Sequence, residues 1–178
     1  MLPLDGRALP PDATDIAVAI RRDGEAYVVD AEFVVQATRK QAWDVLTDYD
    51  HMAEFVSNVT ASRIVRRDPE KMEVAQTSRL GFGPFELKFE NAREIEFIPL
   101  QEIHSTLIRG DMKASSFTTR LTDEGSATRV TNHGRFTPDR WIPPLIGIAV
   151  LEGETRRQFA ELRAEILRRA EPRTAHAP

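Results

Sequence analysis

The sequence, 178 residues long, contains no cysteine. Disulfide bonds, thiolate nucleophiles and zinc–thiolate sites are therefore excluded. It also contains no run of about 18 apolar residues, the length that spans a bilayer, so we expect no stable membrane insertion. Residues 1–11 lack the basic start and the apolar run of a secretory signal peptide. We therefore expect a cytoplasmic protein, although a chain whose leader had been removed would have the same sequence.

An excess of basic residues is missing as well. The chain has 24 lysines and arginines against 28 aspartates and glutamates, which gives a formal net charge of −4. Because proteins that bind nucleic acids carry clustered basic faces, we expect no nucleic-acid partner. The hydrophobic fraction of 41% and the charged fraction of 29% are ordinary for a globular protein. The length suits one domain with one core.

Recognisable catalytic motifs are also absent from the sequence. The four histidines are not at metal-ligand spacing, and no His-Glu-x-x-His run occurs. No serine lies in a Gly-x-Ser-x-Gly elbow, and residues 81–84 are too short for a phosphate loop. We therefore predict neither a metal nor a cofactor, and we name no catalytic residue.

Two early segments have the period of two that is typical of β-strands. Apolar residues alternate over residues 16–20 and recur over residues 27–36. Between them lies Asp23-Gly24, a favoured hairpin turn because glycine accepts a positive φ at little cost. The sequence therefore predicts that the chain opens with a β-hairpin.

Two short helices are predicted directly after this hairpin. Thr38 can cap the first helix, with Gln41 at the capping-box position. Apolar residues follow at helical spacing over residues 42–46, and residues 52–56 indicate the second helix.

The segment from Val59 to Phe136 again has the alternation of strands, separated by short turn signals. Residues 81–84 indicate a loop or a bulge, and Gly110-Asp111 indicates a hairpin turn. Sequential strands with short connections favour an antiparallel meander. We expect five strands here, and with the opening hairpin they make a seven-stranded antiparallel sheet.

The last part of the sequence predicts a long helix. Apolar residues recur at three- and four-residue steps from Ile148 to Ile166, which indicates an amphipathic helix of about six turns. One helix covers a seven-stranded sheet only if the sheet curls around it. The predicted fold is therefore α+β, with a curved sheet wrapped around a C-terminal helix. We expect one domain over residues 15–170, with a flexible lead-in over residues 1–14 and a flexible tail over residues 171–178.

The predicted inner face of the sheet is apolar but carries several polar residues. A close-packed core rarely tolerates many of them, because each unpaired buried polar group costs about 1–3 kcal/mol. A small-molecule cavity, with apolar walls and a few polar groups that orient the ligand, does tolerate such polar residues. The alternative is that these residues lie near strand ends, in water or bonded to one another. The candidate ligand-binding residues are Phe55, Gln76, Ser78, Phe85, Leu87, Phe89, Asn91, Arg93, Ser105, Phe117, Thr119, Asn132, Trp141, Leu151 and Phe159.

Arg93 is the most specific of these candidates. The strand period places it inward beside Asn91, where a buried guanidinium needs an anion or several acceptors. Three interpretations stay open: it binds a carboxylate or phenolate of a ligand, it pairs with an internal acid, or a bulge brings it to the rim.

Residues 141–151 form an unusually apolar stretch at the start of the predicted last helix. Packing in the core is the first interpretation. The alternatives are closure of the cavity mouth, contact with a membrane surface, and a homodimer contact.

This pattern resembles the START-related superfamily of helix-grip proteins, also called SRPBCC or polyketide cyclase/dehydrase-like. The resemblance rests on residues 42–49 (AWDVLTDY), on Phe55, on residues 103–121 and on the long helix to Arg169. It covers residues 16–170 and is closest to the bacterial group that includes the coenzyme Q-binding START proteins. Many relatives have a proline soon after the residue at Phe55, and many have tryptophan in place of Phe117. These two departures weaken the transfer of a particular ligand.

The resemblance implies a hydrophobic pocket between sheet and helix, but it does not imply one function. The first hypothesis is binding or transport of a hydrophobic small molecule, such as a lipid, an isoprenoid, a quinone or a polyketide. The second is a cyclase or dehydratase in which Arg93 holds an enolate or carboxylate and Gln76, Ser78 or Asn91 orients carbonyls. The third is a protein-interaction domain whose pocket is vestigial.

Overall fold

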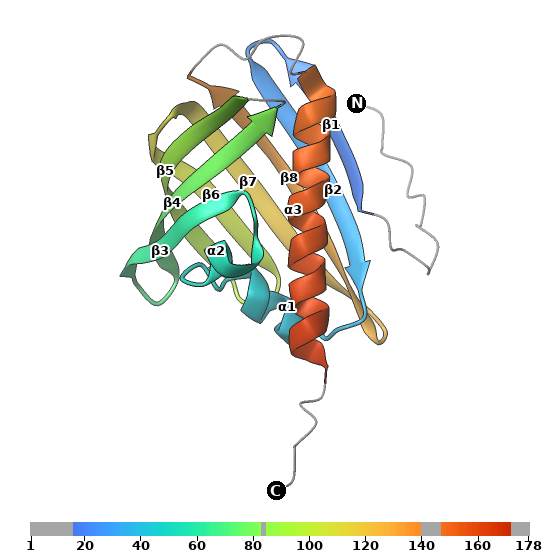
Figure 1. Ribbon diagram of the computed structural model, residues 1–178. Helices are drawn as coiled ribbons and strands as arrows, with labels where there is room; N and C mark the ends of the chain where they lie inside the picture. Colours follow the sequence, from blue (N-terminus) through green and yellow to red (C-terminus); the bar gives the residue numbers. More distant parts are fainter. Residues whose placement is uncertain (1–15, 83–84, 140–146, 172–178) are drawn as a thin grey trace, which may run out of the picture.

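A long helix lies along the concave side of a curved antiparallel sheet (Figure 1). The computed structural model describes residues 16–82, 85–139 and 147–171, and within them the sheet has eight strands in the order β1-β2-β8-β7-β6-β5-β4-β3. The strands are β1 (Ala17–Asp23), β2 (Ala26–Val35), β3 (Val59–Arg67), β4 (Lys71–Phe82), β5 (Phe85–Ile98), β6 (Glu102–Gly110), β7 (Met112–Glu124) and β8 (Ala127–Pro138). The helices are α1 (Arg39–Leu46), α2 (Met52–Phe55) and α3 (Gly147–Ala170). The predicted α+β helix-grip class is confirmed.

The prediction of a seven-stranded sheet was wrong by one strand. Six strands, not five, follow the short helices, because each alternating segment forms a strand of its own. β4 and β5 are antiparallel partners from Lys71↔Glu96 to Phe82↔Phe85, so they do not form one strand interrupted by a bulge. The predicted lead-in over residues 1–14 lies outside the described residues, as does the predicted tail after Glu171.

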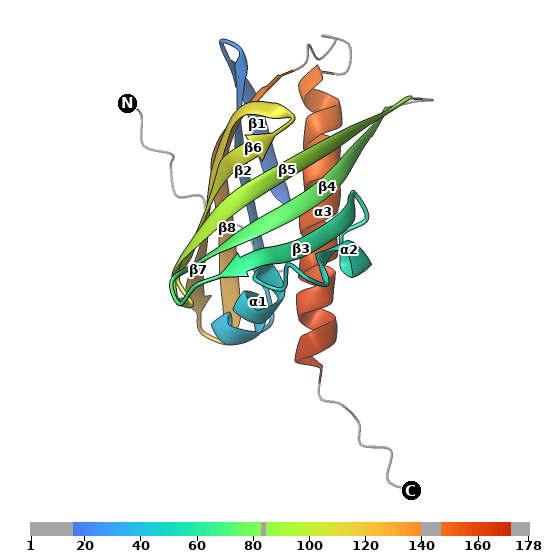
Figure 2. The ribbon, with the colours of Figure 1, turned by 90° about the vertical axis from the view of Figure 1, so that its left-hand side faces the viewer.

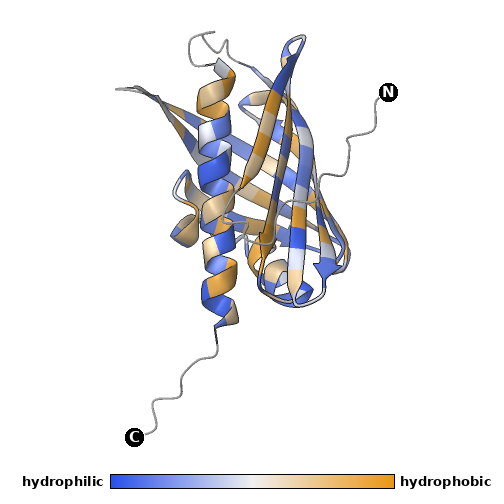
Figure 3. Ribbon diagram, turned by 90° about the vertical axis from the view of Figure 1, so that its right-hand side faces the viewer, coloured by the Kyte–Doolittle hydropathy of each residue, from blue (hydrophilic) through white to orange (hydrophobic). Residues whose placement is uncertain are grey.

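The alternation of residues along the strands decides which face of the sheet turns toward α3 (Figure 3). The lower part of this inner face is a packed core that includes α1, α2 and the C-terminal half of α3. Phe33 on β2 is 0% exposed there, and its ring meets that of Phe159 on α3 edge to face, with 6.1 Å between centroids. A second, smaller apolar cluster, which includes Tyr27 and Leu151, lies farther toward the N-terminal end of α3. The candidate site lies in the space between these two clusters.

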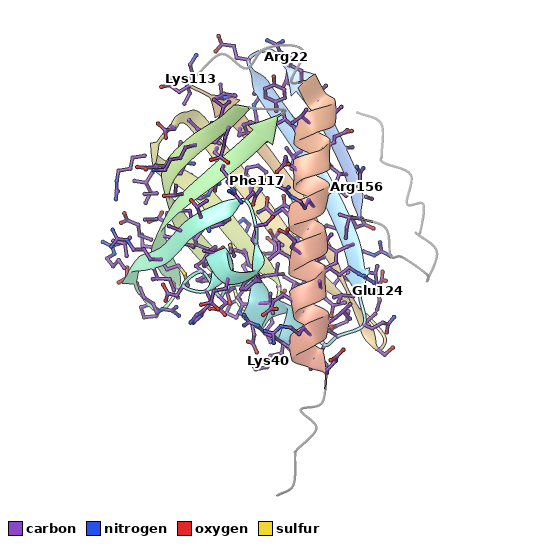
Figure 4. All side chains as sticks on the ribbon, viewed as in Figure 1. Arg22, Lys40, Lys113, Phe117, Glu124 and Arg156 are labelled. Carbon is purple, nitrogen blue, oxygen red and sulfur yellow. The ribbon has the colours of Figure 1, made fainter. Side chains whose placement is uncertain are left out.

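Hydrogen bonds from side chains fix α3 along the edge strand β1 and its neighbour β2. Arg156 Nε donates to the carbonyl oxygen of Ile16 at 3.2 Å, and Glu152 accepts from the backbone nitrogen of Ile20 at 3.1 Å. Figure 4 shows Arg156 on this side of the helix, and Figure 2 shows the strands crossing obliquely around it. Because β1 is an edge strand, these contacts also occupy backbone groups that would otherwise be free to pair with another chain. No helix in the described part of the chain is long and apolar enough to cross a membrane.

The capping box predicted at the start of α1 is present. Thr38 Oγ1 accepts from the backbone nitrogen of Gln41 at 3.3 Å, and Gln41 Oε1 accepts from the backbone nitrogen of Thr38 at 2.8 Å. We expect Thr38→Ala to lower the free energy of unfolding by about 1 kcal/mol, because the backbone N–H of Gln41 loses its acceptor. Chemical denaturation measures this change. Thr38→Ser keeps the hydroxyl and should stay within about 0.5 kcal/mol of wild type; an equal loss in both variants would contradict the capping role.

An ionic network joins the C-terminal end of α3 to the turn after α1. Arg169 Nε donates to Glu165 Oε1 at 2.6 Å, and its Nη1 donates to Asp48 Oδ2 at 2.8 Å. His51 Nδ1 lies 2.6 Å from Asp48 Oδ1. Hydrogen bonds from Arg168, and then from Arg169, lower the pKa of Glu165 although burial opposes them. Burial would raise the pKa of Asp48, but the bonds from His51 and Arg169 outweigh it and lower that pKa.

This network predicts a loss of stability in acid. A carboxyl group whose pKa is lower in the folded state stabilises the fold above its unfolded pKa, which is about 4.3 for glutamate. That contribution disappears as the pH falls through the folded pKa. We therefore expect Glu165→Gln to be less stable than wild type by roughly 1–3 kcal/mol at pH 7, and to lose less stability between neutral pH and pH 3. Urea unfolding at several pH values measures both changes.

The control for this prediction is Glu70→Gln, on the exposed turn between β3 and β4. This variant should follow the wild-type dependence of stability on pH. Parallel curves for wild type and Glu165→Gln would mean that the network does not contribute to folding.

Candidate ligand-binding cavity

A cavity of about 350 Å³ lies between the concave face of the sheet and the N-terminal half of α3. Its walls come from β3 to β8, from α3, and from the segment between Leu46 at the end of α1 and Asn58, with Val29 added from β2. Most of the lining is apolar, with Leu80, Phe89, Phe136 and Phe159 among the larger contributors. The volume falls in the range of about 300–1,000 Å³ that is typical of small-molecule pockets.

Most of the residues predicted from the sequence lie in the wall of this cavity. They share the inward phase of their strands or the sheet-facing side of α3. These residues are Gln76, Ser78, Phe89, Asn91, Arg93, Ser105, Phe117, Thr119, Asn132, Leu151 and Phe159. That they bind a ligand stays a prediction.

Two predicted residues lie elsewhere in the fold. Phe55 on α2 packs against the lower core, and its ring lies 5.2 Å from the guanidinium carbon of Arg169. Leu87 has the expected inward phase but packs against the upper apolar cluster, beyond the cavity wall. Phe85 and Trp141 were also predicted to bind the ligand, but their side chains are outside the part of the chain that the structure describes.

Several lining residues were missing from the predicted set. The alternation placed Ser115 on the inner face of β7 with Phe117 and Thr119, although it was not included among the predicted ligand-binding residues. Tyr49 and Asn58 lie outside regular strands, where no period indicates which way a side chain points. The helix contributes polar residues as well, including Glu154 and Gln158.

Arg93 extends from β5 across the inner surface of β6 toward β7. Its Nε donates to Ser105 Oγ at 2.6 Å, and its Nη2 donates to Ser115 Oγ at 3.1 Å. The same Nη2 lies 3.5 Å from the carbonyl oxygen of Ser105. The guanidinium carbon lies 5.6 Å from the centroid of the Phe117 ring, within reach of a cation–π contact. Three neighbouring strands therefore hold this side chain in place.

The Arg93 charge has no carboxylate partner among the described residues. The register between β5 and β6 shifts between Ala92 and Arg93, but Arg93 still faces inward. The structure therefore contradicts one of the three interpretations, since Arg93 pairs with no internal acid in the described part of the chain. Burial lowers the pKa of Arg93, partly opposed by Tyr49. Arginine nevertheless stays protonated at neutral pH, so the cavity wall contains a partly buried cation.

Other charged residues of the lining are already paired. Arg79 on β4 lies 3.6 Å from Glu86 and donates to the carbonyl oxygen of Ser57 at 3.4 Å. Glu154 on α3 accepts from Arg157. The guanidinium of Arg93 differs from both, because two serine hydroxyls and a carbonyl are its acceptors and its Nη1 has none among the described residues.

Tyr49 is a buried hydroxyl donor in the same cavity. Burial raises its pKa to about 12, against a smaller opposing effect of the Arg93 charge. The phenol therefore stays protonated across the physiological range and can donate a hydrogen bond to an oxygen in the cavity.

Two amide side chains of the cavity donate hydrogen bonds, whereas the amide oxygens of two others have no partner among the described residues. Asn132 Nδ2 donates to Thr119 Oγ1 at 2.8 Å, and Gln76 Nε2 donates to Ser62 Oγ at 3.1 Å. By contrast, Asn58 Oδ1 and Asn91 Oδ1 are buried without a hydrogen-bond partner among the described residues. Buried polar atoms without partners are uncommon in proteins, and each calls for an explanation such as strain, a catalytic role, or a bound water or ion.

The sequence over residues 35–163 matches the family described as polyketide cyclase/dehydrase and lipid transport. A search of curated protein sequences finds no significant match.

Several solved structures have the same fold. The STAR-related lipid transfer protein from Xanthomonas axonopodis superposes with a TM-score of 0.69 at 13% identity, covering 89% of this chain and 97% of its own. The Zhui aromatase/cyclase from Streptomyces sp. R1128 gives 0.67 at 15% identity, with 85% and 97% covered. A START superfamily protein from Mycobacterium smegmatis gives 0.64 at 13% identity, with 80% and 96% covered. At these identities the likeness establishes the fold.

Proposed function

The chain belongs to the polyketide cyclase/dehydrase and lipid transport family, and from this premise we propose that it binds a hydrophobic small molecule with an anionic oxygen. Family membership supports either hydrophobic ligand binding or cyclase-type chemistry. The observation that carries the proposal is the partly buried guanidinium of Arg93, which faces a largely apolar cavity without a carboxylate partner among the described residues.

The physical reason lies in the cost of burying a charge. A buried cation without an anion destabilises a protein, and the two serine hydroxyls and the carbonyl around Arg93 offset only part of that cost. A carboxylate, phenolate or enolate would supply the missing charge and accept from Nη1. Charged hydrogen bonds of this kind are roughly twice as strong as neutral ones. The remaining apolar wall would hold the hydrocarbon part of the ligand.

The volume limits the size of the molecule that fits. An apolar cavity of about 150 Å³ holds one benzene ring, so 350 Å³ corresponds to a buried portion of roughly 15 non-hydrogen atoms. A fatty acid of medium chain length or a two-ring aromatic acid meets this limit. A lipid with two long chains exceeds it.

Two matched pairs of probes test the proposal by isothermal titration calorimetry. The first pair is dodecanoic acid and its methyl ester, and the second is 2-naphthoic acid and its methyl ester. We expect at least one acid to bind, and to bind at least about tenfold more tightly than its ester, because only the acid pairs with Arg93. Equal affinity of acid and ester, or no binding of any probe, would contradict the proposal.

A cyclase or dehydratase is the second candidate, and the position of Tyr49 favours it. Its protonated hydroxyl and the Arg93 cation line one cavity, where they could together stabilise an enolate that forms from a polyketide carbonyl. The test is mass spectrometry of a poly-β-ketone thioester after incubation with the protein, which would show loss of water on cyclisation and dehydration. If Arg93→Ala changed neither ligand binding nor turnover, the cyclase idea would be abandoned.

The third hypothesis, a protein-interaction domain with a vestigial pocket, has less support. It requires a pocket too small for a ligand of more than a few atoms, whereas this cavity measures about 350 Å³.

A further inference from the structure

We propose that Gly134 determines which ligands fit beside Arg93, because it lets the Phe117 ring lie flat against β8. The inference rests on the proposed function, since it concerns the Arg93 end of the same cavity. It adds a determinant of ligand size that lies outside the cavity lining itself.

Gly134 and Phe117 are direct partners in the pairing of β7 with β8. The ring of Phe117 occupies the space where a side chain at position 134 would stand. A Cβ atom at this position would lie 2.0 Å from Cδ1 and 2.4 Å from Cγ of Phe117, far closer than real Cβ contacts. Gly134 does not have a positive φ, so its backbone does not need glycine. The requirement for glycine is one of space alone.

On β7, Phe117 lies between Gly134 on β8 and Ser105 on β6, and its ring lines the Arg93 end of the cavity. The Arg93 guanidinium lies 5.6 Å from the ring centroid, and Ser105, which accepts from Arg93, is the direct partner of Phe117 on β6. Figure 4 shows Phe117 on the concave side of the sheet, toward α3. The order of groups is therefore the β8 backbone at Gly134, then the phenyl ring, then the guanidinium.

A methyl group at position 134 would affect ligand binding indirectly, by displacing first the Phe117 ring and then the guanidinium. It would push the Phe117 ring off β8, toward the cavity that the ring lines. The space next to the cation would shrink, and the guanidinium would lose its present alignment. Ligands that are broad next to their anionic group should therefore lose the most affinity, and a slender acid should lose the least.

The test compares binding of 2-naphthoic acid and dodecanoic acid to wild type and variants by isothermal titration calorimetry. We expect Gly134→Ala to weaken the binding of 2-naphthoic acid by about tenfold or more relative to the binding of dodecanoic acid, as overpacking of a filled site predicts. Gly134→Ala combined with Phe117→Leu should recover most of this loss, because the smaller side chain leaves room for the methyl group. Such a recovery is a coupling that a general loss of stability would not produce.

Gly81→Ala is the matched control. Gly81 is also a strand glycine without a positive φ, and an added Cβ there meets no described atom within 4 Å. It does not line the cavity. This variant should bind both acids as wild type does.

The outcomes separate this inference from the proposed function. If wild type binds neither acid, the proposed function fails and this inference fails with it. If wild type binds and folded Gly134→Ala keeps the same preference between the acids, the inference alone is overturned. If Gly134→Ala does not fold, the double variant decides: folding with restored binding supports the clash with Phe117, and continued failure to fold overturns it.

Discussion

Arg93→Met is expected to weaken the binding of an acidic probe by about 30-fold or more, and at the same time to stabilise the unliganded protein. Removing one partner of a buried charged pair typically costs 2–5 kcal/mol of binding free energy, which gives the fold-change. The stability should change in the opposite direction, because the variant no longer holds a partly buried cation without an anion. Even for buried ion pairs, in which each charge has a partner, replacement by well-packed apolar side chains of similar volume is often neutral or stabilising by about 1–4 kcal/mol.

Calorimetric titration and urea unfolding of the same preparation measure the two effects. Arg79→Met is the matched control, because Arg79 also lines the cavity but is partly exposed and lies 3.6 Å from Glu86. Its effects on binding and on stability should both be small. If Arg93→Met destabilised the protein and bound the acid as wild type does, Arg93 would have a structural role and the proposed function would lose its main support.

The largest loss of stability is expected for Phe33→Ala, at about 3–5 kcal/mol. Phe33 is completely buried between β2 and α3, where its ring meets Phe159. Truncation removes apolar contacts and leaves a cavity that the surrounding core cannot fully close. Because Phe159 also lines the ligand cavity, the variant should in addition loosen one wall of the binding site.

Urea unfolding of Phe33→Ala against Ile98→Ala measures this loss. Ile98 is an isoleucine near the end of β5 with 44% of its surface exposed, so its truncation should stay within about 0.5 kcal/mol of wild type. A loss below about 1 kcal/mol for Phe33→Ala would mean that α3 does not pack against β2 as described.

Much of the fold could be predicted because its signals are local. The alternation along the strands, the capping box at Thr38 and Gln41, and the period of α3 all follow from short stretches of sequence. The predicted number of strands was one too low, although the segments on both sides of residues 81–84 had the alternation of strands. The pairing of β4 with β5 shows that each of these segments is a strand of its own.

The site could be predicted only in part, and for a related reason. Strand residues such as Gln76 and Asn91 were identified because a period of two fixes the side to which they point. Tyr49 and Asn58 were missed because loop residues have no such period. The environment of Arg93 depends on hydroxyls from β6 and β7, and the role of Gly134 depends on its pairing with Phe117. These are contacts across strands, which a single sequence does not specify.

We propose that the Arg93 cavity holds an acidic, mostly apolar molecule. Native mass spectrometry of freshly purified wild type and Arg93→Met, followed by organic extraction of any bound molecule, tests it most directly. We predict a wild-type adduct at one per chain that extracts as an apolar acid of roughly 15 non-hydrogen atoms, and its loss from Arg93→Met. An adduct retained unchanged by Arg93→Met, or an extracted molecule without an acidic group, would contradict the claim.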